Sequence, residues 1–154
     1  DARIQWYLVG DTEQRLKNIT HRDTLPLSIR CIAHRTIKEI PLWLSAADLC
    51  VALGTKKNEY SYYHTSPMKL FEYMAIPGRG IIAADTPAIK EIVSDDEVVF
   101  YTPDNAYDLK TKIARMIISP HESVLKSQNA FERVKGFTWE KRADAIVQFI
   151  KNRI

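Results

Sequence analysis

The chain has 154 residues, of which 45% are hydrophobic and 27% charged, with a formal net charge of +3. This length and composition suit one globular domain with a real core. The Lys and Arg residues are scattered rather than clustered, which argues against a nucleic-acid-binding protein, and the longest apolar run, residues 41–54, is interrupted by Asp48 and is too short to span a membrane.

Strand-like and helix-like segments alternate along the chain. The expected strands are short apolar runs at residues 3–9, 29–33, 48–53, 80–84 and 97–101. The expected helices cover residues 12–19, 37–47, 67–76 and 87–93 and a helical tail, and residues 54–65 are expected to form a polar, tyrosine-rich loop. This alternation predicts an α/β fold, a Rossmann-like open parallel sheet with helices on both faces, and we expect residues 1–154 to form a single domain.

The two cysteines, Cys31 and Cys50, each lie within an apolar run that is an expected strand. This placement favours small, reduced core residues over a disulfide or a metal-binding pair. It also favours the cytoplasm, and no charged leader with an apolar segment opens the chain. The expected location is therefore cytoplasmic, with a peripheral membrane contact of a longer protein left open.

The start of the helix expected at residues 67–76 carries the most informative chemistry. Ser66 is a favoured N-cap residue, and Pro67 is a favoured first helical residue. The backbone N–H groups of Met68 and Lys69 should then be free at a helix N-terminus, because the first N–H groups of a helix have no partner within it. Such a helix end attracts phosphate.

A cation and a carboxylate follow on one face of this helix. Glu72 and Tyr73 come three and four residues after Lys69, which places Glu72 about 4.5 Å further along the axis. The carboxylate of Glu72 can accept hydrogen bonds from a ribose diol while Lys69 and the helix end hold a diphosphate. The same ten residues also suit an ordinary amphipathic helix with a cap and a surface ion pair.

Residues 66–75, Ser-Pro-Met-Lys-Leu-Phe-Glu-Tyr-Met-Ala, resemble the donor-binding motif of the GT-B glycosyltransferases, in particular the large retaining family 4. Members of this family commonly read Ser-Pro-x-Lys-x-x-Glu-x-Met-Ala here, followed by a turn and an apolar strand. Further pieces in the family's order are found at residues 41–51, 76–85, 89–93, 101–105 and 137–140. The resemblance runs nearly end to end and implies the donor-nucleotide-binding half of such an enzyme.

Two loops contribute further candidate residues. In related glycosyltransferases the loop after the second strand contacts the nucleobase, so the resemblance implies this role for Arg35, Thr36 and Ile37. Gly54 and Thr55 follow the third strand and are expected at the carboxyl edge of the sheet, where ligands of open α/β sheets bind. Gly54 would allow a close backbone approach because it has no side chain. Both loops can equally be ordinary turns.

His64 departs from the family pattern. Many family 4 enzymes have a carboxylate eight residues before the position of Glu72, and that carboxylate holds hydroxyl groups of the donor sugar. A neutral imidazole can donate and accept a hydrogen bond, so His64 can take over part of this role. The alternative is a solvated loop histidine.

The start of the chain is a second departure. The donor half of the family begins with one more strand and a loop that supplies a basic residue for the diphosphate, whereas the strand before Gly10 resembles the second one. We therefore expect a fragment without the first strand and without the N-terminal, acceptor-binding half.

Other catalytic motifs are missing from the sequence. The glycines form neither Gly-x-Gly-x-x-Gly nor a phosphate loop, which argues against dinucleotide oxidoreductases and P-loop NTPases. The histidines and cysteines lack a spacing suited to zinc, and the chain contains no Gly-x-Ser-x-Gly elbow.

The prediction is therefore the donor half of a retaining glycosyltransferase that binds a UDP- or GDP-sugar, with polysaccharide biosynthesis as the implied setting. Its partners would be this donor and the N-terminal domain of the same protein, which binds an unknown glycan, lipid or other acceptor. No cofactor and no metal are expected, because backbone N–H groups and Lys69 would stabilise the departing diphosphate. The isolated fragment is expected to be inactive. A non-catalytic flavodoxin-like interaction module and a sugar-nucleotide epimerase of GT-B architecture are the alternatives.

Overall fold

The computed structural model describes residues 4–153. The chain divides into two compact units, Asp1–Leu42 and Trp43–Ile154, and the boundary falls within helix α2 (Ile40–Ala46). The single-domain prediction for residues 1–154 stays a prediction.

The first unit contains a two-stranded parallel sheet and one helix. Strand β1 (Trp6–Val9) pairs with β2 (Ile29–Ile32), with Trp6 opposite Ile29 and Val9 opposite Ile32. Helix α1 (Glu13–Thr20) connects the strands, and the side chain of Thr12 caps it by accepting a hydrogen bond from the Arg15 N–H at 3.2 Å. None of the described residues 4–42 is fully buried, because one helix and two strands cannot enclose a core.

The second unit is built on a three-stranded parallel sheet in the order β3-β4-β5. Its strands are β3 (Leu49–Ala52), β4 (Gly80–Ala84) and β5 (Val99–Tyr101). The central strand β4 is buried along its whole length, which agrees with its continuous run of small and apolar residues. Leu49 lies opposite Gly80, and Ala84 lies opposite Tyr101.

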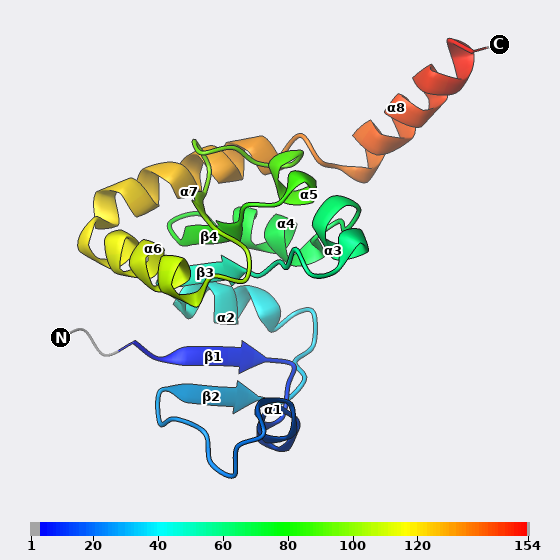
Figure 1. The fold of residues 1–154 in the computed structure, drawn as a ribbon. Coiled ribbons are helices and arrows are strands. Elements are labelled where there is room, and N and C mark those ends of the chain that lie inside the picture. The colour runs from blue at the N-terminus through cyan, green and yellow to red at the C-terminus, as the bar shows by residue number, and fades with distance from the viewer. Residues whose placement is uncertain (1–3, 154) are drawn as a thin grey trace. The chain divides into compact units, whose positions relative to one another are not determined.

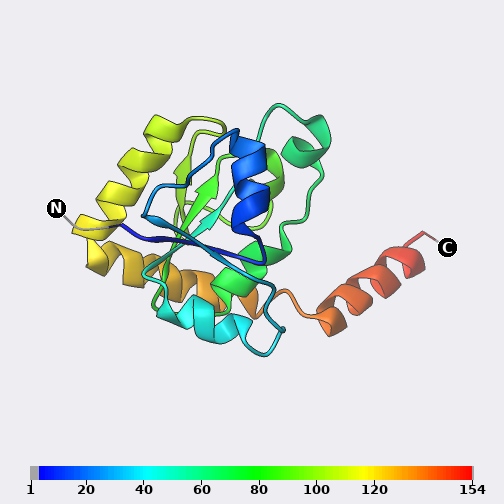
Figure 2. The same cartoon turned by 90° about the horizontal axis from the view of Figure 1, so that it is seen from below.

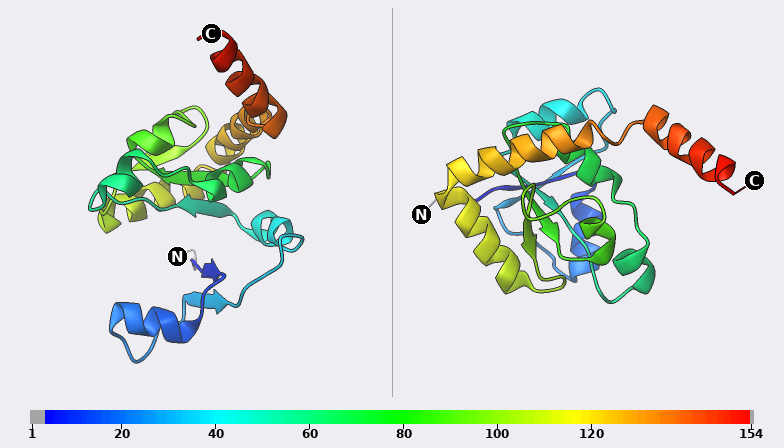
Figure 3. Two further views of the ribbon diagram at one scale, coloured as in Figure 1. Left: turned by 90° about the vertical axis from the view of Figure 1, so that its right-hand side faces the viewer. Right: turned by 90° about the horizontal axis from the view of Figure 1, so that it is seen from above.

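The helices that follow β3 are α3 (Glu59–Tyr63), α4 (Met68–Met74), α5 (Pro87–Lys90), α6 (Ala106–Ile118), α7 (Pro120–Val134) and α8 (Trp139–Lys151). Of these, α4, α6 and α7 pack against the sheet (Figure 1). Helix α4 contacts β3 and α7, α7 contacts β4, and α6 contacts β5. Figure 2 shows α6 and α7 packed side by side, and Figure 3 shows α8 extending away from α7. No residue of α8 is buried.

The core lies between the sheet and these helices. Its fully buried side chains include Leu70 and Met74 from α4, Ile81 and Ile82 from β4, and Met116 from α6. The buried hydroxyl of Ser127 has a hydrogen-bond partner here, as expected for a native core. The backbone N–H of Arg79 donates to Oγ of Ser127, which is 1% exposed, at 3.0 Å.

The predicted α/β class with parallel strands is confirmed. The strands form two parallel sheets, β1-β2 and β3-β4-β5, where one sheet was expected. The prediction that residues 54–65 form a loop throughout is wrong, because they contain the one-turn helix α3. Asn58 stabilises this turn by accepting a hydrogen bond from the Ser61 N–H at 2.9 Å, and such a short turn leaves no periodic apolar pattern in the sequence. The helical tail consists of α6, α7 and α8.

Both cysteines are free, and of the two predicted core residues Cys50 is buried whereas Cys31 is only half-buried. Cys50 is buried in β3, and this burial raises the pKa of its thiol to about 11, so the group stays protonated at neutral pH. None of the helices within residues 4–153 has the length and apolarity that a membrane span requires.

The two methionines at the ends of α4 allow a direct test of this core. Met74 is fully buried, whereas Met68 is 64% exposed. We expect Met74→Ala to lower the free energy of unfolding by about 2–5 kcal/mol, because the substitution leaves a cavity. The matched variant Met68→Ala should change it by less than about 0.5 kcal/mol. Urea denaturation measures both, and equal effects would contradict the burial of this face of α4.

Candidate functional site

Helix α4 begins one residue later than the sequence predicted. Its first residue is Met68, and the N-cap residue is Pro67, with φ −78° and ψ 89° and no side-chain cap. The prediction that Ser66 caps the helix is therefore wrong. The carbonyl of Pro67 accepts the first hydrogen bond of the helix from the Leu70 N–H at 2.8 Å, so Pro67 occupies the cap position itself.

The first turn of α4 does expose backbone donors. Within residues 4–153, the N–H groups of Met68 and Lys69 have no hydrogen-bond partner. The helix has only seven residues, so its dipole is small and its charge at this end depends mainly on the side chain of Lys69. Ser66, just before the helix, is exposed and can offer its hydroxyl to the same ligand.

The packing of α4 separates a buried face from a charged one. Leu70 and Met74 are fully buried, whereas Lys69 and Glu72 are exposed. Tyr73 was expected on the charged face, but it is half-buried, and this burial raises the pKa of its hydroxyl to about 12. Lys69 and Glu72 are therefore the two charged groups that this helix presents to a ligand.

These two charges do not pair with each other. Among the described residues, neither Lys69 nor Glu72 forms an ion pair or a side-chain hydrogen bond. Other charged pairs at three- and four-residue spacing do pair, such as Lys17 with Glu13 at 2.8 Å. The described residues therefore do not contain the surface ion pair that an ordinary amphipathic helix would have at this position.

Gly54 has a packing role at the end of β3. A Cβ atom at Gly54 would lie 2.8 Å from Cβ of Ala84 and 3.2 Å from Cγ2 of Thr86. Ala84 belongs to the buried strand β4 and cannot move aside easily. The absence of a side chain at Gly54 therefore lets β3 and the segment after β4 approach each other, whether or not a ligand also comes close.

Thr55 is held by a residue that the sequence analysis did not include among the site residues. The hydroxyl of Thr55 lies 2.8 Å from Oδ1 and 3.0 Å from Oδ2 of Asp104, in the loop after β5. The nearest signal in the sequence was an acidic residue just after the fifth expected strand, at the same carboxyl edge as Thr55. Their pairing depends on the strand order, which the sequence alone did not give.

His64 follows α3 and is exposed. Its ring centroid lies 6.1 Å from that of Tyr60 and 6.1 Å from that of Tyr63. The structure thus places His64 in a small aromatic group, two residues before Ser66. No hydrogen bond of its ring is present within residues 4–153, so both ring nitrogens are available.

The predicted base-contacting residues Arg35, Thr36 and Ile37 lie in the first unit, in the turn before α2. The N–H and the hydroxyl of Thr36 both donate to Oε2 of Glu39, at 2.9 and 2.8 Å. These hydrogen bonds hold the pKa of Glu39 below its usual value. The N–H of Thr36 is therefore already hydrogen-bonded within the protein. The neighbouring Ile37 is 83% exposed.

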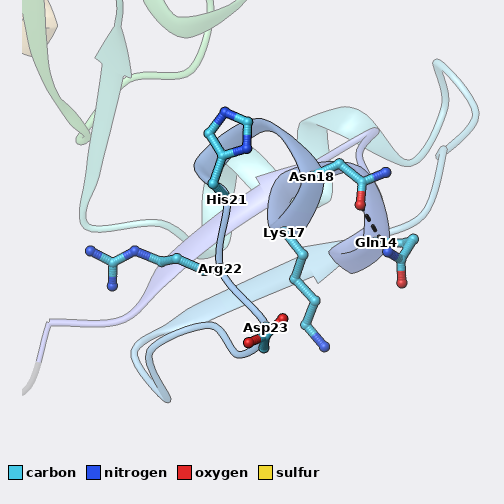
Figure 4. Close-up of a pocket in the computed structure, with 6 residues that line it drawn as sticks. All are labelled: Gln14, Lys17, Asn18, His21, Arg22 and Asp23. Carbon is cyan, nitrogen blue, oxygen red and sulfur yellow. Dashed lines mark hydrogen bonds between the residues drawn. The ribbon is translucent and has the colours of Figure 1, made fainter.

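Two hollows, one in each unit, differ in size, and of these only the smaller is lined by a predicted site residue, Gly54. A small one of about 30 Å³ is lined by Gly54, Thr65, Pro67 and Thr86, among others, and has room for water but not for a nucleotide. A larger one of about 570 Å³ lies on α1 in the first unit (Figure 4). It is lined by Gln14, Lys17, Asn18, His21, Arg22 and Asp23, which include none of the predicted site residues.

The candidate site of the second unit thus consists of exposed groups rather than a closed cavity. It lies at the carboxyl edge of the β3-β4-β5 sheet, since α4 leads from this edge back to the start of β4. Residues 4–153 contain no cluster of His, Cys, Asp or Glu suited to a metal ion. The chemistry available is an ammonium group, a carboxylate, free N–H groups and an imidazole.

A family model for glycosyl transferases of group 1 matches residues 1–119 of the chain. Among curated proteins, no significant match is found.

Solved structures are similar in fold. Sucrose-phosphate synthase from Thermosynechococcus elongatus is 23% identical with a TM-score of 0.74, and the match covers 96% of this chain and 38% of that protein. HepE from Anabaena, solved with UDP-glucose, is 20% identical with a TM-score of 0.74, covering 96% of this chain and 41% of HepE.

A third similar structure is the C-terminal domain of a group 1 glycosyl transferase family protein, LpcC, from Francisella tularensis. It is 22% identical with a TM-score of 0.56, and the match covers 79% of this chain and 58% of that domain. At these identities the likeness shows the fold. The chain spans about two fifths of the length of the sucrose-phosphate synthase and of HepE.

Substitution of Gly54 tests its packing role. Gly54→Ala should lower the free energy of unfolding by about 1–3 kcal/mol, because the new methyl group overpacks the contact with Ala84. Gly136→Ala is the control, since its new Cβ would meet one atom, the Arg133 carbonyl oxygen, at 3.1 Å, and it should cost less. Thermal and urea denaturation measure this difference. An unchanged stability of Gly54→Ala would mean that packing does not require this glycine.

Proposed function

The chain belongs to the group 1 glycosyl transferases, and we propose that it is the donor-binding half of a retaining enzyme that takes a nucleotide-diphosphate sugar. The observation that carries this proposal is the pair Lys69 and Glu72 on α4. Both are exposed, charged and without a partner among the described residues. They lie beside free N–H groups at the carboxyl edge of a parallel sheet, the usual ligand edge of such folds.

Each group suits one part of a nucleoside diphosphate. The ammonium group of Lys69 and the N–H groups of Met68 and Lys69 would contact the diphosphate, with Ser66 adding a hydroxyl. The carboxylate of Glu72, one turn further, would accept hydrogen bonds from the ribose hydroxyls. His64 would contact the donor sugar, and Gly54 and Thr55 would border it. Arg35, Thr36 and Ile37 stay candidates for the nucleobase.

The same groups would assist the reaction. When the bond between the sugar and the diphosphate breaks, negative charge develops on the departing phosphate oxygens. Lys69 and the neighbouring N–H groups are already in place at that point, so no reorganisation is needed to stabilise the charge. Among the nucleotides, UDP is the first choice because the structurally similar HepE was solved with UDP-glucose, and GDP is the main competitor.

Transfer also needs an acceptor and the exclusion of water from the reacting carbon of the sugar. The hollow at this edge of the described residues has a volume of about 30 Å³, which is too small to enclose a nucleotide. We therefore assign acceptor binding to a further domain of the same protein, which agrees with the chain's share of about two fifths of HepE.

Substitution of Glu72 tests the ribose contact. Glu72→Gln removes the charge but keeps the shape, so it should weaken binding of UDP or GDP by about ten- to a hundredfold, the loss of about 1.5–3 kcal/mol expected for a hydrogen bond to an ionised group. Glu91→Gln, which neutralises another exposed carboxylate, should leave binding unchanged. NMR titration of the labelled chain measures both. Equal affinity of Glu72→Gln and the unsubstituted chain would remove Glu72 from the site, and no binding of either nucleotide would favour a non-binding interaction module.

Substitution of Lys69 tests the phosphate contact. Lys69→Ala should reduce affinity for UDP by about tenfold or more and leave affinity for uridine nearly unchanged, because only UDP presents phosphate oxygens to the ammonium group. Binding of UDP should also weaken as salt is added. Lys110→Ala, at an exposed lysine of α6, is the control. If uridine and UDP lose affinity equally in Lys69→Ala, the lysine supports the helix rather than the phosphate.

A further inference from the structure

Two loops that are far apart in the sequence are joined by one carboxylate. Asp104, after β5, accepts hydrogen bonds from the hydroxyl of Thr55 at 2.8 Å and from the backbone N–H of Lys56 at 3.0 Å, both in the loop after β3. The N–H of Lys57 in turn donates to Oγ1 of Thr55 at 3.1 Å. The backbone course of residues 55–57 therefore depends on Asp104.

The same loop is fixed at a second point. The N–H of Gly54 donates to the hydroxyl oxygen of Tyr101, at the end of β5, at 3.4 Å. Strand β4 lies between β3 and β5, so residues 54–57 cross the carboxyl end of β4 to reach these partners. The close approach of Gly54 to Ala84 and Thr86 agrees with this path.

Asp104 has an unusual backbone conformation. Among residues 4–153, only Asp104 (φ 62°) and His21 (φ 52°) are non-glycine residues with positive φ. Asp tolerates this left-handed region better than most residues, but a glycine would adopt it without a steric cost. An aspartate at this position therefore carries backbone strain that a glycine would not. Its side chain forms hydrogen bonds with Thr55 and Lys56 that a glycine could not form.

The charge of Asp104 is maintained by its neighbours. The hydrogen bond from the Thr55 side chain, the Lys56 N–H and the charges of Lys57 and Lys56 lower the pKa of the Asp104 carboxyl below its usual 3.8. A group with a lowered pKa keeps its contribution above that value and loses it as the pH falls through it. The Asp104 hydrogen bonds are thus intact at neutral pH.

We propose that Asp104 is a positioning residue for donor binding, because it fixes residues 54–57 across the end of β4, beside the edge where the nucleotide sugar binds. This inference rests on the proposed function of that edge. Asp104 acts through the loop: its carboxylate oxygens are already occupied by Thr55 and Lys56, and an anion would repel the diphosphate.

The main test compares Asp104→Gly with His21→Gly in the 154-residue chain. Both variants place glycine at a positive φ and so relieve the same kind of backbone strain, but only Asp104→Gly also loses the hydrogen bonds to Thr55 and Lys56. Only Asp104→Gly frees the loop, so it alone should weaken UDP binding, by about tenfold. The amide proton of Lys56 should also exchange faster with solvent in Asp104→Gly, with or without nucleotide.

A double-mutant cycle identifies the contact responsible. Thr55→Val removes the hydroxyl from the opposite side of the same hydrogen bond, so Thr55→Val combined with Asp104→Gly should weaken UDP binding little more than Asp104→Gly alone. Asp104→Asn keeps an acceptor oxygen and tolerates a positive φ, and it should retain part of the affinity.

The outcomes separate this inference from the proposed function. If the unsubstituted chain binds UDP or GDP and Asp104→Gly binds it equally well, Asp104 has no positioning role, while the donor site stands. If Asp104→Gly loses affinity without faster exchange at Lys56, Asp104 acts by direct contact and the positioning role is overturned. If the unsubstituted chain binds neither nucleotide, the proposed function fails, and the role of Asp104 in donor binding fails with it.

Discussion

Strand β4 is the constraint on which the second unit depends. It is buried along its whole length and pairs with β3 on one side and β5 on the other, so its residues must be small or apolar. At its start, a Cβ on Gly80 would lie 2.7 Å or less from Leu49, Met116 and Ser123. At its end, Ala84 contacts the position of Gly54. This packing brings the loops after β3 and β5 to either side of one strand end, where Thr55 meets Asp104.

Helix α4 packs one face on this core and presents charged side chains on the other face. Leu70 and Met74 are fully buried, so the rotation of the helix about its axis is fixed, and Lys69 and Glu72 must then face outward. Their separation of three residues would allow an ion pair, but none forms between them. Two opposite charges that stay apart on a rigid helix can contact two different groups of one ligand, which a collapsed pair could not.

Much of this could be predicted from residue patterns, because local sequence decides it. Strand β4 was predicted with its observed bounds, since an apolar run lies between a Pro-Gly turn and Asp85. The start of α4 was misplaced by one residue because Ser66 and Pro67 both suit a helix start, and only the observed ψ of Pro67 decides between them. The separation of the strands into two sheets and the contact between Thr55 and Asp104 depend on long-range pairing. No local pattern encodes such pairing, so the role of Asp104 could not be predicted from the sequence.

The charged groups on α4 are exposed, and exposure weakens electrostatic contacts with any ligand. Around exposed groups such as Lys69 and Glu72, the effective dielectric constant is high and salt screens their charges, so each proposed contact with a nucleotide would be weaker than the same contact in an enclosed site. The short α4 adds only a weak dipole at its first turn. In the proposed enzyme, a second domain closing over the carboxyl edge would remove water and strengthen the same contacts without any change in their geometry. The residues on α4 would then provide orientation in the open state and charge stabilisation in the closed one.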